Sequence, residues 1–197
     1  MQCKRYILIF LLFCIAITNV YAKSFNLDED KSKITYSLTQ FGIPFKRKDL
    51  PASGKVYFTD DEALENKLPC SESFPIAGVD LTAKFTSKNP LFRKVINLDK
   101  YPSFSFSSKI EAPILLSDKE FVEIPGYLTF HGVTQNINAE LKCKKEESKL
   151  ILRGHLNIKM TDFGIKPPRI LFIPIDNVIK NKIEIVVSPE GKLMNNE

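Results

Sequence analysis

The stretch KLILRGHLNIKM, residues 149–160, decides the fold because its side chains alternate between apolar and polar along nearly its whole length. Leu156 and Ile158 fall on one side of the chain, whereas Arg153 and Lys159 fall on the other. A repeat of two residues is typical of a β-strand, and one apolar face opposite one polar face is typical of antiparallel sheets with water on one side.

The same alternation recurs along the chain after residue 30 and predicts about eight strands. They include residues 34–39, 55–58, 79–85, 103–107, 127–131, 136–143, 149–160 and 182–188. Turn-forming residues separate them at 51–54, 99–102, 132–135 and 146–148, and the last two links are predicted hairpins. Helical signals are confined to two short segments, one starting at Asp60 and one at residues 90–96.

Eight strands of this kind can close into an antiparallel barrel, which removes the exposed sheet edges. A β-sandwich needs the same alternation, so the pattern alone leaves it open. An outer-membrane barrel would turn the polar faces toward a narrow lumen, and charges such as Lys142, Arg153 and Glu184 would be crowded there. We therefore predict an all-β fold, an eight-stranded barrel with one or two short helices.

The N-terminus has the pattern of a secretory signal peptide. Lys4 and Arg5 precede an apolar run over residues 7–17, and Val20 and Ala22 are small residues at the positions that a signal peptidase reads. We predict a signal peptide over residues 1–22 and a single mature domain over residues 23–197, located in the periplasm or secreted. An uncleaved N-terminal anchor is the alternative.

The predicted mature chain is only mildly basic. Two of the 28 basic groups and none of the 23 acidic groups lie in the predicted signal peptide, so the formal net charge changes from +5 to +3. The lysines and arginines are scattered rather than gathered on one face, which argues against a nucleic-acid partner.

Two cysteines, Cys70 and Cys143, remain in the predicted mature chain, and an oxidising compartment would allow them to pair. A bridge would close a long loop and stabilise the fold by up to roughly 4 kcal/mol. Two separate buried thiols also fit the sequence. There is no CxxC motif or Cys/His cluster, so no metal site or cofactor is expected.

Three segments resemble a known family in order and spacing. YPSFSFSS (residues 101–108) is similar to its Tyr-Pro turn and following strand, GYLTFHGVT (126–134) to its G-x-L-T-x-x-G-V-T hairpin, and MTDFGI (160–165) to its S/T-D-F-G loop. The family is that of the YceI-like polyisoprenoid-binding proteins. The resemblance implies a lipocalin-like eight-stranded barrel, export from the cytoplasm, and an apolar channel that holds an isoprenoid or another fatty molecule.

The alternation also predicts which side chains point inward. Large aromatic side chains in a small barrel leave elongated gaps, and each methylene of a lipid tail buried there gains about 0.8 kcal/mol. The same side chains could instead form only a packed core. The apolar segment 169–175, bounded by prolines, could cover the barrel mouth as a lid or close one end as a plug. The candidate ligand-binding residues are Tyr36, Leu38, Phe58, Leu81, Phe85, Phe104, Phe106, Leu128, Phe130 and Leu156, with Phe172 from that segment.

No catalytic motif is present. His131 and His155 fall on the predicted polar faces, and Asp162 is expected to be a turn residue. We expect a protein that is not an enzyme and whose partner is an apolar lipid, with a homodimer compatible with the sequence. A structural or stress-response module with a filled core is the second hypothesis. A lipid isomerase or cyclase ranks last, because the inward positions offer little polar chemistry beyond the Tyr36 hydroxyl.

Overall fold

The computed structural model describes residues 23–59, 74–88, 90–146 and 149–187. The predicted signal peptide, the predicted helix at Asp60, and Cys70 lie outside these ranges. No helix in the described ranges has the length and hydrophobicity required to cross a bilayer. The elements are β1 (Lys23–Asn26), β2 (Lys33–Gln40), β3 (Ile43–Phe58), β4 (Phe74–Lys84), α2 (Pro90–Val95), β5 (Ser103–Ser108), β6 (Ile114–Leu116), β7 (Val122–Phe130), β8 (Val133–Glu146), β9 (Lys149–Lys159), the 3-10 turn η1 (Met160–Phe163), β10 (Arg169–Ile170), β11 (Ile173–Pro174) and β12 (Val178–Val187).

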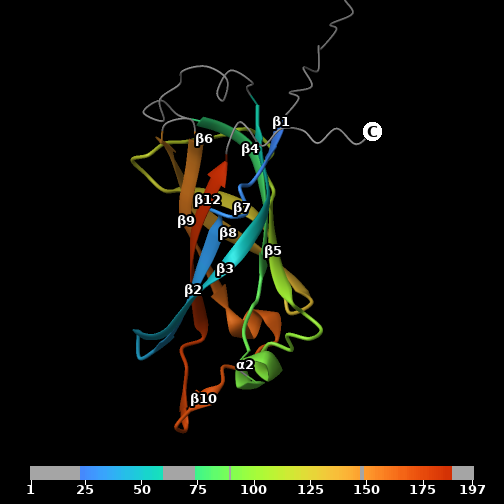
Figure 1. Cartoon of the computed structure of the whole chain (residues 1–197), viewed down its shortest axis with the longest axis vertical. Coiled ribbons are helices and arrows are strands. Elements are labelled where there is room, and N and C mark those ends of the chain that lie inside the picture. The colour runs from blue at the N-terminus through green and yellow to red at the C-terminus, as the bar shows by residue number, and fades with distance from the viewer. Residues whose placement is uncertain (1–22, 60–73, 89, 147–148, 188–197) are drawn as a thin grey trace, which may run out of the picture.

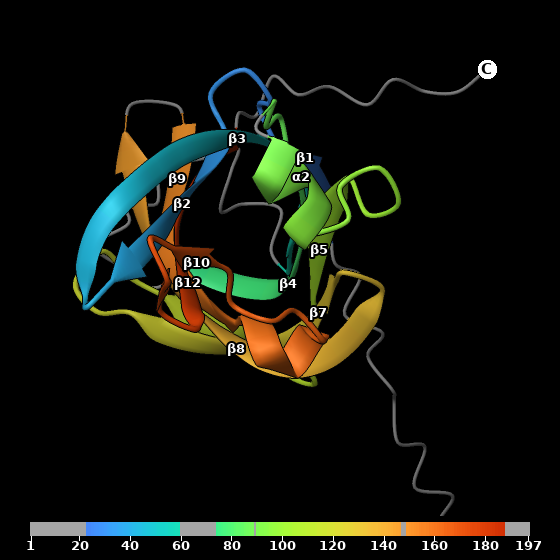
Figure 2. The ribbon, with the colours of Figure 1, turned by 90° about the horizontal axis from the view of Figure 1, so that it is seen from below.

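Eight strands close into an antiparallel barrel (Figures 1 and 2). Their order is β3-β2-β12-β9-β8-β7-β5-β4, and β4 pairs back with β3 to complete the ring. The short strands β1 and β6 pair with the outer parts of β3 and β4. The predicted eight-stranded barrel is confirmed, and closure of the ring decides against the sandwich. The helix predicted at residues 90–96 is also confirmed, as α2.

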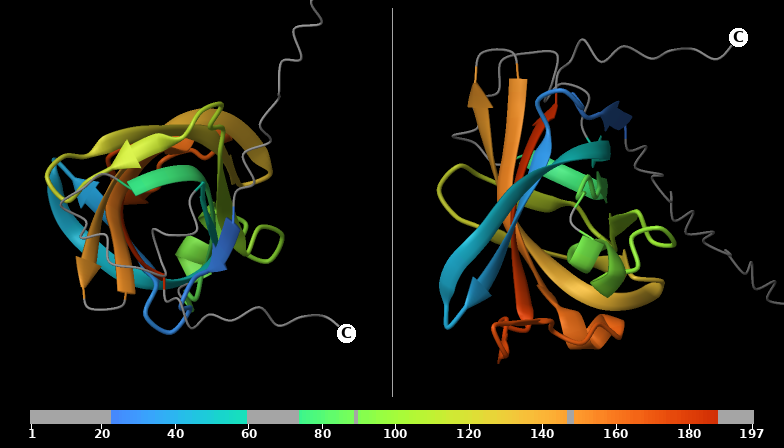
Figure 3. Two further views of the ribbon diagram at one scale, coloured as in Figure 1. Left: turned by 90° about the horizontal axis from the view of Figure 1, so that it is seen from above. Right: turned by 60° about the horizontal axis from the view of Figure 1, so that its bottom comes forward.

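The turn predicted at residues 51–54 is wrong. Strand β3 runs unbroken through these residues, pairing with β2 up to Pro51 and with β4 from Ala52 onward. Gly54 allows the strand to curve around the barrel, because its φ is 142° and a Cβ there would lie 2.0 Å from the carbonyl oxygen of Asp80. The actual turn lies earlier, at Phe41 and Gly42, and the long arc of β3 is visible in Figure 3.

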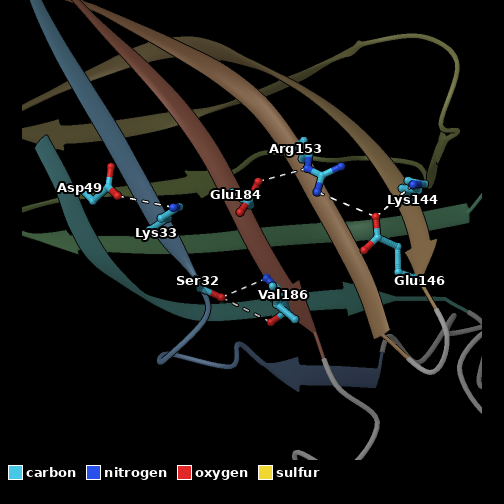
Figure 4. Close-up of polar contacts among 8 residues, drawn as sticks. All are labelled: Ser32, Lys33, Asp49, Lys144, Glu146, Arg153, Glu184 and Val186. Carbon is cyan, nitrogen blue, oxygen red and sulfur yellow. Dashed lines mark hydrogen bonds and ion pairs between the residues drawn. The ribbon is translucent and has the colours of Figure 1, made fainter. Parts of the chain in front are cut away.

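Apolar side chains line the inside of the barrel, whereas charged side chains lie outside. Figure 4 shows charged residues that follow one another across neighbouring strands of the outer face. Lys33 Nζ lies 3.5 Å from Asp49 Oδ2, and Arg153 Nε donates to Glu184 Oε2 at 3.2 Å. An outer-membrane barrel has the reverse arrangement, with apolar side chains outside.

The two ends of the barrel differ. The short strands β1 and β6 lie at one end, together with Ser32, whose hydroxyl accepts a hydrogen bond from the N–H of Val186 (Figures 1 and 4). Helix α2, the β2–β3 turn and the β10–β11 hairpin lie at the opposite end (Figure 1). We call this second end the helix end.

Candidate functional site

Ten of the eleven predicted ligand-binding residues point into the barrel. Nine are buried in the hydrophobic core, and Phe85 is half-buried against them. The alternation therefore predicted the inward face correctly, while the ligand-binding role of these residues stays a prediction. The ten are Tyr36, Leu38, Phe58, Leu81, Phe85, Phe104, Phe106, Leu128, Phe130 and Leu156.

Six rings meet inside the barrel near its helix end. Tyr36 on β2 stacks on Phe92 of α2, with ring centroids 5.7 Å apart and planes 11° apart. Phe85 lies 5.9 Å from Phe92 and 5.8 Å from Phe130, whose ring lies 5.7 Å from that of Phe163 in η1. We call these residues the aromatic cluster: Tyr36, Phe85, Phe92, Phe104, Phe130 and Phe163.

Two buried polar atoms face this apolar interior. Tyr36 and Asn181 are direct neighbours across β2 and β12, and each residue is only 2% exposed. The amide nitrogen of Asn181 donates to the carbonyl oxygen of Leu156 at 2.8 Å. Within the described ranges, neither the Tyr36 hydroxyl nor Asn181 Oδ1 has a hydrogen-bond partner. Such a buried, unpaired group costs roughly 1–3 kcal/mol and calls for an explanation.

The chemistry of this polar pair is that of neutral hydrogen bonding. Burial raises the pKa of the Tyr36 hydroxyl above its ordinary value of 10.0, so the phenol stays protonated at physiological pH. A protonated phenol donates one hydrogen bond, and the Asn181 amide oxygen accepts one. Together they suit a hydroxyl, carbonyl or ester group better than an ion.

Sequence reasoning missed three members of this site. Asn181, Ile183 and Ile185 lie on the same face of β12, so the alternation along this strand could have placed Asn181 inside. Phe92 and Phe163 lie on α2 and η1, and the two-residue period that identifies inward strand positions does not apply to such short helical turns.

The segment 169–175 forms a small hairpin, and Phe172, at the turn of the hairpin, does not plug the end of the barrel. Strands β10 and β11 pair, and Leu171 and Phe172 make the turn between them. Phe172 is 93% exposed at this turn, whereas Ile175 at the end of the segment is buried, and the ligand-binding role of Phe172 stays a prediction. The role of the hairpin as a lid stays a prediction.

The remaining candidate residues have structural contacts. His131 is half-buried with Nδ1 3.1 Å from the carbonyl oxygen of Phe163, and His155 lies on the surface beside Phe121. Asp162 is a turn residue in η1, as predicted. In the ranges that the structure describes, no three histidine, cysteine or acidic side chains gather into a group that could hold a metal ion.

The predicted disulfide stays a prediction, since Cys70 lies outside the described residues. Cys143 is buried, with its Sγ 3.6 Å from the carbonyl oxygen of Leu116.

A hollow of about 390 Å³ lies on the outer face of β2, β3 and β12. Its walls carry Arg47, Asp49 and Lys182, so it does not suit an apolar molecule.

Comparisons with known proteins agree with the barrel fold. Residues 25–190 match the family model described as YceI-like domain. The crystal structure of BcnA from Burkholderia cenocepacia is similar, with a TM-score of 0.60, 18% identity, and coverage of 81% of this chain and 98% of that one. A polyisoprenoid binding domain from Saccharophagus degradans, implicated in plant cell wall breakdown, gives a TM-score of 0.55 at 12% identity, covering 83% and 97%. No curated protein matches the sequence.

Proposed function

The chain belongs to the YceI-like domain family, and from that premise we propose that it is a binding protein rather than an enzyme. Its ligand is a long apolar molecule with a small neutral polar group, such as a polyisoprenoid alcohol or quinone, or a fatty ester. The barrel holds this molecule inside, for transport, storage or scavenging. The structurally similar domain from Saccharophagus degradans is described as polyisoprenoid binding, which supports the same class of ligand here.

One observation carries the proposal: two polar atoms buried in the barrel interior have no hydrogen-bond partner among the residues that the structure describes. The Tyr36 hydroxyl and Asn181 Oδ1 offer a donor and an acceptor on adjacent strands. A ligand whose polar group meets them would remove the cost of burying these atoms, and its tail would contact the aromatic cluster. Phe85 and Phe92 are the members of that cluster that remain partly exposed, which favours entry from the helix end.

A barrel with a filled core, acting through its surface, is the second candidate. The close contacts among the aromatic rings favour it, since Phe85 alone lies within 6.5 Å of four other ring centroids. A ligand would then have to displace rings that already pack against one another. Under this alternative, the barrel would carry no lipid.

Extraction and an internal reporter distinguish the two candidates. The protein, purified without detergent, is extracted with organic solvent, and the extract is analysed by mass spectrometry. The chain has no tryptophan, so Phe85→Trp introduces a single tryptophan, which can be excited apart from the tyrosines, within the aromatic cluster. Tyr127→Trp is the matched control, since Tyr127 is exposed on β7.

We expect an apolar molecule in the extract. Adding a polyprenyl alcohol or a ubiquinone to delipidated protein should change the emission of Phe85→Trp and leave that of Tyr127→Trp unchanged. An empty extract, together with no response of Phe85→Trp to either probe, would establish the filled barrel instead.

We propose further that the protein acts outside the cytoplasm, on the basis of residues 1–22. Lys23 would then be the first residue of the mature chain. Cell fractionation followed by N-terminal sequencing tests this directly. Full-length protein that stays in the membrane fraction would favour an uncleaved anchor.

A further inference from the structure

Two neighbouring turns at the helix end carry exposed apolar side chains. Phe41 is 77% exposed in the β2–β3 turn, and Leu171 and Phe172 are 84% and 93% exposed in the β10–β11 turn. Figures 1 and 3 show the hairpin projecting at the same end as the β2–β3 turn. We call this surface the apolar tip: Phe41, Ile43, Ile170, Leu171, Phe172 and Ile173.

Hydrogen bonds fasten the two turns to each other. The carboxylate of Asp176 accepts hydrogen bonds from the N–H groups of Phe41, at 3.1 Å, and Gly42, at 2.8 Å. The side-chain amide of Gln40 donates to the carbonyl oxygen of Ile173 at 3.2 Å. The apolar tip is therefore a fixed surface made by two segments that lie far apart in the sequence.

The backbone of the apolar tip adopts an unfavourable conformation for its residues. Phe41, Leu171 and Phe172 have φ values of 53°, 49° and 67°, where bulky side chains are rare and Asn-Gly is the preferred pair. His131 occupies the same kind of turn, but its ring contacts Tyr101. The three tip side chains are mostly exposed, so burial does not offset their conformation. Strained backbone residues cluster at functional sites, so this exposed apolar surface is a candidate for a function of its own.

Basic residues accompany the apolar tip. Arg169 belongs to β10, Lys166 precedes it, and both are exposed. Lys46 follows the β2–β3 turn, with its Nζ 5.0 Å from the centre of the Phe92 ring. The acidic group that contacts the tip, Asp176, has both carboxylate oxygens engaged by backbone N–H groups. Apolar side chains beside cationic ones fit the surface of an anionic bilayer.

We propose that the apolar tip docks the barrel onto anionic lipid bilayers, with Phe41, Leu171 and Phe172 entering the interface. Lys166 and Arg169 would lie at the level of the phosphate groups. A second copy of the chain fits this surface less well, because it would bring the same cationic residues together. The proposal goes beyond ligand binding, since docking requires no molecule inside the barrel.

Vesicle co-sedimentation tests the docking. The purified protein is mixed with vesicles of phosphatidylcholine alone or of phosphatidylcholine with phosphatidylglycerol. The test variant is Leu171→Asn/Phe172→Gly, which places the preferred turn pair where the strained residues stand and so should fold at least as well. Leu115→Asn is the matched control, because Leu115 is also exposed, at 58%, but lies on β6 at the other end.

We expect the wild type and Leu115→Asn to bind the anionic vesicles. The double turn variant should bind them on the order of tenfold more weakly, and Lys166→Gln/Arg169→Gln should weaken binding and reduce its salt dependence. Equal binding by the double turn variant, or no binding by the wild type, would overturn the proposal. So would a concentration-dependent dimer that the double turn variant abolishes, since the tip would then pair with a second copy.

Discussion

Replacing Tyr36 by Phe should stabilise the empty barrel and weaken ligand binding at the same time. The change removes a hydroxyl that has no partner in the described ranges and keeps the ring that stacks on Phe92 at 5.7 Å. Relief of the buried, unpaired group should add about 1–3 kcal/mol to the free energy of unfolding. For a domain of this length, each kcal/mol corresponds to a rise in Tm of about 2–4 °C.

Ligand affinity should move in the opposite direction. Ligand binding to the wild type removes the cost of the unpaired hydroxyl, about 1–3 kcal/mol, and Tyr36→Phe loses this gain, so the affinity for a polyprenyl alcohol or quinone should fall roughly five- to hundredfold. Thermal unfolding of delipidated protein, followed by circular dichroism, measures the first effect, and titration of the Phe85→Trp reporter measures the second. Tyr127→Phe, on the exposed side of β7, should change neither. A lower Tm for Tyr36→Phe would refute the reasoning, because it would mean that the hydroxyl is already satisfied in the empty protein.

Three further predictions test the fold. Gly54→Ala should lower the free energy of unfolding by more than about 2 kcal/mol, because the new Cβ would lie 2.0 Å from the Asp80 carbonyl oxygen; an unchanged urea midpoint would contradict this. Hydrogen bonds from Thr39, and from the N–H groups of Gly42 and Phe41, hold the pKa of Asp176 below its ordinary value of 3.8. The Asp176 carboxylate therefore stabilises the fold fully above pH 3.8, and this stabilisation is lost as the pH falls through the lowered pKa. The difference in Tm between wild type and Asp176→Asn should be present at neutral pH and become smaller in acid. A difference in Tm that does not change with pH would contradict this. If Cys70 and Cys143 are paired, alkylation of the denatured, unreduced protein should label neither, and mass spectrometry that finds both labelled would exclude the bridge.

Strand identity could be predicted from sequence because it depends on a local period. Alternation gave most strands of the barrel and their inward faces. The prediction was wrong where residues that favour a turn lie inside a strand, and where a turn is formed by residues that do not favour one. Residues 51–54 carry Pro, Ser and Gly, which favour a turn, yet the pairing of Ala52 with Ala83 holds them in β3. The actual turn was hidden because Phe41, rather than Asn, occupies its first position.

The candidate site was only partly accessible to the same reasoning. The alternation along the strand identified Tyr36 as an inward-facing residue. Whether its hydroxyl finds a hydrogen-bond partner depends on how β12 and α2 pack around it in three dimensions. Tyr36 lies on a strand and Phe92 on a short helix, and the two segments have different residue repeats. No pattern in the sequence therefore predicts the contact between them. The exposure of Phe172 likewise depends on a hairpin of two-residue strands, which is too short to give a periodic signal.

The position of β12 has a consequence for the order in which the barrel can assemble. Counting only the eight strands of the ring, every neighbouring pair joins strands that follow each other along the chain, except that β2 meets β12, from the far end of the described sequence. During synthesis, β2 and β9 therefore keep open edges until β12 emerges, and closing the ring is a late, slow step. A chain with such edges risks pairing with other chains. If the chain is exported as proposed, crossing a membrane before the last strand docks would keep that hazardous intermediate out of the crowded cytoplasm.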